Sequence, residues 1–325
     1  MLGLILPLNG CDAANDGTGN GGTTAIDCSG GSGIAAAVCE AAAAFDATLS
    51  ESQQTAVRYD FNEGNADNWS NFPVGGMATR NGLEFADLSD DQLEAALDLT
   101  RTALSDAGYG TFDGIRAADD YLGERQGGYG SGLYLIAFLG TPSATDAWML
   151  QLGGHHYALN FTYQGDTASP TPYFVGVEPL TFTLDGERYA PMEERAATAT
   201  AMLDALSSDQ LASAQLSGSF RDVLLGPGAD GEFPEPSGLQ VSSLDADQRA
   251  LVTEAIEAWV LDADEDTAAE LLAEYTSDAA LDETYIGYSG GTDLETQGSY
   301  IRIDGPRVWI EIVAQGGIVL SGIHY

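Results

Sequence analysis

Apolar residues along this chain follow two different periods, and the change between them separates helical from extended blocks. Leu93, Ala96, Leu97, Thr100 and Leu104 recur at intervals of three and four residues, the spacing of one helix face. The same reading predicts helices at residues 34–47, 51–58, 90–106, 111–123, 192–205, 208–216, 246–260 and 265–275.

A short phrase recurs four times where these helices are predicted to begin. It places Ser or Asp three residues before Gln, and its copies start at Leu49, Leu88, Leu206 and Leu244. This is the pattern of a capping box, in which the cap oxygen accepts a free backbone N–H and Gln reaches back to the cap residue. Because the spacings are irregular, we interpret the phrase as repeated helix-start chemistry and not as a solenoid.

Extended segments with a period of two form two clusters, at residues 132–177 and 283–325. The strands are expected at 132–140, 147–153, 155–164, 172–177, 283–289, 299–304, 307–314 and 317–325. Strands in sequential clusters, with capped helices before and between them, predict an α+β fold with an antiparallel sheet. No linker divides residues 33–325, so we expect a single domain there, with a two-lobed arrangement as the alternative.

Charge excludes one class of partner. The chain has 11 basic residues, all of them Arg, against 50 acidic ones, for a formal charge of −39. A nucleic-acid binder needs a cationic stripe along the phosphate backbone, and this chain has none. Anionic membrane surfaces are disfavoured for the same reason.

The N-terminal segment suggests export. Residues 2–8 are apolar and lead into Leu8-Asn9-Gly10-Cys11, which resembles the cleavage box of a bacterial lipoprotein. We therefore expect a signal over residues 1–11, membrane attachment through acylated Cys11, a flexible tether over residues 12–32 and a location in the cell envelope or outside the cell. A plain secretory signal is the alternative. In such an oxidising compartment Cys28 and Cys39 are expected to form a disulfide.

The three histidines are the candidate site. His155 and His156 follow two glycines at the start of a predicted strand, and His324 ends the last one. Regular alternation sends His156 and Asn160 to one face and His155 to the core face, unless the glycines form a bulge. We predict that His155, His156 and His324 bind a divalent transition metal. The alternative is that they are structural histidines, hydrogen-bonded to sheet neighbours.

A charged pair completes the candidate set. Arg302 and Glu311 lie on neighbouring predicted strands, where they form either a cross-strand pair or part of a site. The catalytic hypothesis assigns His156 and His324 as ligands or general acid and base, with Asn160 or Arg302 orienting a small-molecule substrate.

Several short motifs together resemble one family. They are Leu139-Gly140-Thr141-Pro142-Ser143, Trp148, Gly154-His155-His156, Asn160-Phe161-Thr162, Arg80-Asn81-Gly82-Leu83, the run Tyr300–Pro306, Glu311 and His324. The resemblance is to the domain of unknown function 3500 family, whose members are largely exported proteins. It implies that the three histidines are a shared feature. It also implies that relatives continue past His324, so this chain is either a truncated fragment or a natural variant.

These observations lead to two hypotheses. The first is an exported, lipid-anchored α+β protein with a metal-dependent, hydrolase-like site centred on histidine. The second is a non-catalytic envelope module that binds a ligand and uses its histidines structurally.

Overall fold

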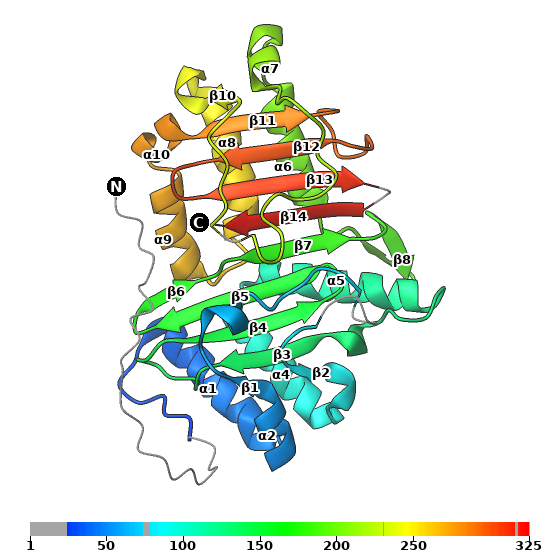
Figure 1. Cartoon of the computed structure of the whole chain (residues 1–325), viewed down its shortest axis with the longest axis vertical. Helices are drawn as coiled ribbons and strands as arrows, with labels where there is room; N and C mark the ends of the chain where they lie inside the picture. Colours follow the sequence, from blue (N-terminus) through cyan, green and yellow to red (C-terminus); the bar gives the residue numbers. More distant parts are fainter. Residues whose placement is uncertain (1–24, 74–78, 230, 316–317, 325) are drawn as a thin grey trace.

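The computed structural model describes residues 25–73, 79–229, 231–315 and 318–324. Cys11 and most of the expected tether lie outside these residues. The described chain forms one sheet of twelve strands, mostly antiparallel, and a separate two-stranded sheet (Figure 1). The α+β prediction is confirmed.

The predicted helices and strands are present near their expected positions. The helices are α1 (Gly33–Thr48), α2 (Glu51–Val57), α3 (Glu63–Ala66), α4 (Asp90–Ala103), α5 (Asp106–Gly123), α6 (Glu193–Asp204), α7 (Ser208–Ala214), α8 (Ala246–Val260), α9 (Glu265–Tyr275) and α10 (Asp278–Glu283). The strands are β1 (Arg58–Tyr59), β2 (Leu83–Glu84), β3 (Leu135–Leu139), β4 (Trp148–Gly154), β5 (Tyr157–Gln164), β6 (Thr167–Ser169), β7 (Tyr173–Val177), β8 (Phe182–Leu184), β9 (Glu187–Tyr189), β10 (Leu239–Gln240), β11 (Tyr285–Ser289), β12 (Tyr300–Asp304), β13 (Trp309–Gln315) and β14 (Ile318–His324). The structure thus adds short elements that were not predicted, namely α3, α10, β1, β2, β6, β8, β9 and β10.

All four predicted capping boxes form. The caps are Ser50, Ser89, Ser207 and Asp245, and each side chain accepts the N–H of the Gln three residues later. The capping glutamines also pair between helices. The amides of Gln53 and Gln92 bond to each other at 3.0 Å, and those of Gln210 and Gln248 at 2.9 Å. Each pair joins the starts of two helices.

The order of strands in the large sheet reads the same from both ends. The path β3-β4-β5-β7 meets β14-β13-β12-β11 at the centre of the sheet, with β2 paired to β3 and β10 paired to β11. Both halves contain, in order, a capped short helix, a short strand, a long capped helix, a further helix and the four strands of the path. In addition, the first half has β1, α3 and β6, and the second half has α10. The chain is therefore built from two copies of one topological unit.

A glycine at a close approach between two backbone segments occurs at the same position in both halves. Gly82 precedes β2 with φ 121°, and Gly238 precedes β10 with φ 113°. A Cβ at Gly82 would lie 2.6 Å from the carbonyl oxygen of Ile136, and one at Gly238 would lie 2.3 Å from that of Ile286. Only glycine fits such a close approach of backbone to backbone. The two glycines therefore have the same structural role in the two units.

An approximate twofold axis relates these units. It passes between β7 and β14, where Tyr173 pairs with Ile323. Leu104, just after α4, forms a bridge with Ala263, just after α8, so a second symmetric pair lies on the axis. The two halves thus form one continuous sheet.

Helices and irregular segments cover opposite faces of the sheet. In Figure 1, α6 and α8 lie behind the strands, while α3 and stretches of coil cross in front of them. The main core cluster lies between the strands and the helices, and includes Phe138, Trp148, Tyr157, Ile256 and Ile310. On the other face, buried side chains such as Gln151 and Glu311 bond to the covering segments.

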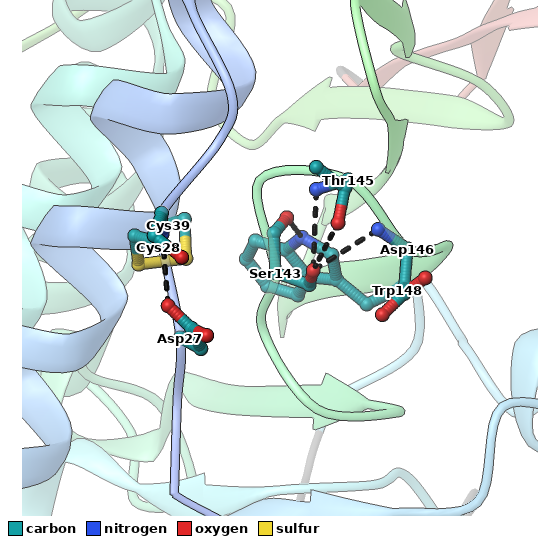
Figure 2. Close-up of a disulfide and its surroundings, with 8 residues drawn as sticks. Asp27, Cys28, Cys39, Ser143, Thr145, Asp146 and Trp148 are labelled. Atoms are coloured by element: carbon teal, nitrogen blue, oxygen red, sulfur yellow. Dashed lines mark hydrogen bonds between the residues drawn. A yellow bond between two sulfur atoms is a disulfide. The ribbon is translucent and has the colours of Figure 1, made fainter.

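The predicted disulfide is present. Cys28 pairs with Cys39 of α1, which fixes the segment before α1 to the first helix. Figure 2 shows this bond beside the loop that contains Ser143 and Trp148. The Ser143 hydroxyl accepts the N–H groups of Thr145 and Asp146, and the Trp148 indole donates to the Ser143 carbonyl. This motif therefore builds a loop.

Candidate metal centre

A two-residue turn carries the histidine pair. Strands β4 and β5 end at the paired residues Gly154 and Tyr157, and only His155 and His156 lie between them. His156 has φ 60°, in the left-handed region that few residues other than glycine adopt. The two rings lie side by side, with centroids 3.7 Å apart. The strand-like alternation that we expected does not hold here, because these residues are in the turn and not in the ladder.

Asp119 of α5 orients the first of these rings. Its Oδ1 lies 2.7 Å from Nδ1 of His155, and both side chains are almost fully buried. Burial raises the pKa of the Asp119 carboxyl, and the bond to His155 acts in the opposite direction. The Tyr134 hydroxyl donates to the His155 carbonyl, and Tyr129 contacts the ring edge-on. His155 is thus held with Nδ1 toward Asp119, which leaves Nε2 to act as a ligand.

His156 is buried without polar partners for its ring. Neither Nδ1 nor Nε2 has a hydrogen-bond partner among the described residues, although the side chain is only 7% exposed. Burial, followed by the neighbouring His155, lowers the pKa of His156 well below its ordinary value. Burial thus favours the neutral ring, which is the form that binds metals.

Glu178 brings a carboxylate to the same place. It follows the last residue of β7 and precedes Pro179, to which it is joined by a cis peptide bond. Donor atoms of His155, His156 and Glu178 all lie within 4.8 Å of one another. In a tetrahedral zinc site with bonds near 2.1 Å, ligands are about 3.4 Å apart. The three donor atoms therefore lie near one another at a spacing somewhat wider than that of a loaded site.

The other half of the molecule makes the equivalent turn without histidine. Register matches Gly154 with Gly305, so that Pro306 and Arg307 occupy the positions of His155 and His156. The turn between β12 and β13 closes with a bond from the Gly305 N–H to the Val308 carbonyl. Since the fold builds this hairpin with other residues, the histidine pair is not needed to turn the chain.

A segment before β2 covers the histidine turn. The His156 N–H donates to the carbonyl of Asn71 at 3.0 Å. The guanidinium of Arg80 donates to the carbonyls of Ser70, at 2.8 Å, and of Gly154, at 3.2 Å. Arg80 therefore holds residues 70–72 against the turn.

The structure does not bring His324 to the other two histidines. Val319 of β14 pairs with Val177, next to Glu178, and the strand runs from there to Ile323 opposite Tyr173. Five residues at about 3.3 Å each place the backbone of His324 about 16 Å along the sheet from that end. The backbone of His324 therefore lies away from the histidine turn, whereas Glu178 is the described acidic side chain that joins His155 and His156.

Asn160 and Arg302 have partners elsewhere. The Asn160 amide donates to the Pro172 carbonyl at 2.8 Å and accepts from Gln151 at 3.0 Å. Arg302 lies opposite Glu311 in the ladder, donates to the Ser237 carbonyl and lies over the Trp309 ring. Register makes Gln151 and Asn160 the counterparts of Arg302 and Glu311. Both pairs thus belong to a repeated buried contact, and neither joins the histidine turn.

A family model described as "Protein of unknown function (DUF3500)" matches residues 32–325, nearly the whole chain. The chain belongs to the DUF3500 family. No curated protein and no solved structure matches it.

No helix in the described part of this DUF3500 chain is both long and apolar enough to cross a membrane.

The sequence did not identify two residues of the candidate site, Asp119 and Glu178. Asp119 is one of two adjacent aspartates on a helix, and Glu178 is a single acidic residue before a proline. Neither has a spacing to the histidines that identifies it. The one usable signal was the pair of glycines before His155, which marks a tight turn.

Proposed function

We propose that this DUF3500 protein binds a divalent transition metal, with zinc as the first candidate, through His155, His156 and Glu178. The observation that supports it best is the convergence of three donor groups, one of which has two buried nitrogens without a partner among the described residues. A set of two histidines and one carboxylate is a familiar ligand set for catalytic zinc.

Asp119 supports the same proposal. Metal-binding histidines commonly donate their other ring N–H to a carboxylate, which fixes the tautomer and strengthens the ligand. Asp119 stands in that relation to His155 at 2.7 Å. The site thus has both a ligand set and the outer contact that such a set requires.

Three protein ligands leave one position of a tetrahedral ion for water, so the chemistry we propose is hydrolysis. Held by His155, His156 and Glu178, such an ion would lower the pKa of that water and so supply a nucleophile for a carbonyl or phosphoryl centre. In such a hydrolysis the bond to the leaving group would break, and the leaving group would take up the proton that the water loses. Water is the only co-reactant in this step.

Metal content tests the proposal directly. Protein purified without a tag, stripped with chelator and titrated with Zn²⁺ is expected to bind one ion per chain with micromolar or tighter affinity. His156→Ala and Glu178→Gln are expected to lose this binding. The matched control is Arg307→Ala, at the equivalent turn of the other half, which should bind like wild type. Wild-type protein that takes up no ion, or variants that bind as well as wild type, would refute the site.

Metal binding without hydrolysis has a separate meaning. If zinc binds but the loaded protein cleaves no ester, amide or phosphoester from a broad panel, the ion is structural and the chain is a non-catalytic module. That outcome would retain the metal site and reject the hydrolase.

We also propose that the protein is exported and anchored by acylated Cys11. Support comes from the apolar run before Leu8-Asn9-Gly10-Cys11 and from the Cys28–Cys39 disulfide, a bond typical of oxidising compartments. Labelling cells with a palmitate analogue should mark the wild-type chain and not Cys11→Ser, and the wild-type chain should sediment with membranes. Equal labelling of both chains, or none of either, would refute the anchor.

A further inference from the structure

Arg80 and Asn71 leave polar atoms unused beside the proposed metal centre. The Nε and Nη2 groups of Arg80 are occupied by the carbonyls of Ser70, Phe72 and Gly154. Its Nη1 is buried and has no hydrogen-bond partner within residues 25–73, 79–229, 231–315 and 318–324. The same is true of Oδ1 of Asn71, whose side chain is 4% exposed and whose carbonyl accepts the His156 N–H.

Four buried polar atoms without a hydrogen-bond partner among the described residues belong to three side chains around this turn. Arg80 touches the residue before His155, and Asn71 touches His156 itself. His156 adds two ring nitrogens to the same group. Buried polar groups are normally satisfied, so a cluster of unsatisfied ones indicates a missing ligand or ordered water.

The positive charge of Arg80 indicates that the missing ligand is an anion. No salt bridge to Arg80 occurs among the described residues, and burial lowers the pKa of its guanidinium to about 10. Asp119 is the acidic group whose charge acts on it, and Asp119 is already bonded to His155. A buried cation without a bonded counterion is stabilised by an incoming anion.

We infer that Arg80 and the metal centre together bind the anionic oxygens of a small oxoacid, a carboxylate or phosphoryl compound. This inference rests on the metal site proposed above and names its substrate class. One oxygen binds the ion and another accepts from Nη1 of Arg80. Asn71 Oδ1 then accepts from a donor on the ligand or from a bridging water.

Cobalt substitution provides a test with a readout other than activity. Co²⁺-loaded protein is titrated with inorganic phosphate and, separately, with acetate, and the visible absorption of the ion is followed. Both anions are expected to change the spectrum at saturable concentrations, and the tighter of the two identifies the ligand group. Arg80→Met is expected to weaken anion binding at least about tenfold while the affinity for Co²⁺ stays within about twofold.

A second variant covers the case in which Arg80→Met fails to fold, since Arg80 also holds residues 70–72. Asn71→Asp keeps the size of the side chain and Arg80, but adds a negative charge where the anion would bind. It too is expected to weaken anion binding about tenfold, with an unchanged circular dichroism spectrum.

The outcomes separate the two proposals. A chain that binds no Co²⁺ refutes the metal site on which the inference depends. If Co²⁺ binds but neither anion changes the spectrum, or both variants bind anions like wild type, then the anion site is refuted and the metal site stands.

Discussion

Tyr173 and Ile323 face each other across the centre of the sheet, and each occupies the same position in its own half of the molecule. The approximate twofold axis runs through this pair. The histidine turn lies away from the axis and occurs in one half only, so the two halves share a fold and differ in chemistry. That asymmetry is the basis for treating the turn as functional.

Because His156 has a left-handed backbone conformation, we expect its replacement by glycine to raise the stability of the metal-free protein and to abolish zinc binding. We expect His156→Gly to unfold at a higher urea concentration than wild type when both are metal-free. The variant removes backbone strain of about 1 kcal/mol and a buried imidazole without partners, against the loss of some packing. It should bind no zinc. A clearly less stable variant would mean that the ring is a packing element and not a ligand.

Replacing Asp119 tests its positioning role. Asp119→Asn is expected to weaken zinc binding by about 10–100-fold, because the carboxylate no longer fixes the His155 ring. The neighbouring Asp120→Asn is the control, since Asp120 bonds to the Ser131 N–H and not to a histidine. Competition titration with a chromophoric chelator gives both affinities. Equal affinities for the two variants would contradict the assignment.

Acid is expected to destabilise the metal-free protein through His156. Its pKa is held well below the ordinary value in the folded state, while the unfolded chain has a pKa near 6.5. The unfolded state therefore takes up the proton first as the pH falls, so the stability is full above about pH 6.5 and declines below it. Between pH 7.5 and pH 5.5 the free energy of unfolding should fall by about 1 kcal/mol more in wild type than in His156→Gln, measured by urea denaturation in chelator. Parallel pH profiles would show that folding does not lower the pKa of His156.

A buried ion pair near the twofold axis should dominate the electrostatic stability. Arg195 of α6 bonds to Asp262, and the Tyr173 hydroxyl donates to the same carboxylate at 2.7 Å. Arg195→Met is expected to cost about 3–5 kcal/mol, because it leaves Asp262 buried without its cation.

The exposed pair of Arg188 with Glu193 is the matched control for this prediction. Both of its side chains are more than half exposed. Arg188→Met should therefore cost less than about 1 kcal/mol. Similar losses for the two arginine variants in urea denaturation would contradict this ranking.

Local signals in the sequence were sufficient for most helices and strands. A helix start depends on a cap residue and on a partner three positions away, so the phrases beginning at Leu49, Leu88, Leu206 and Leu244 could be interpreted without a structure. The same four phrases also reflect the duplication of the topological unit. They form two pairs, and the structure shows that each pair joins two helices of one half through its glutamines.

The sequence by itself determined the periods, the helix caps and the α+β class, because each of these depends on residues close together in the chain. Only the tertiary structure decided which side chains meet at the histidine turn. Asp119 lies on a helix and Glu178 at the end of a neighbouring strand, and both lie at the turn. The register of β14 places the backbone of His324 away from it. Strand order and register depend on contacts between distant segments, and such contacts leave no fixed spacing in a sequence.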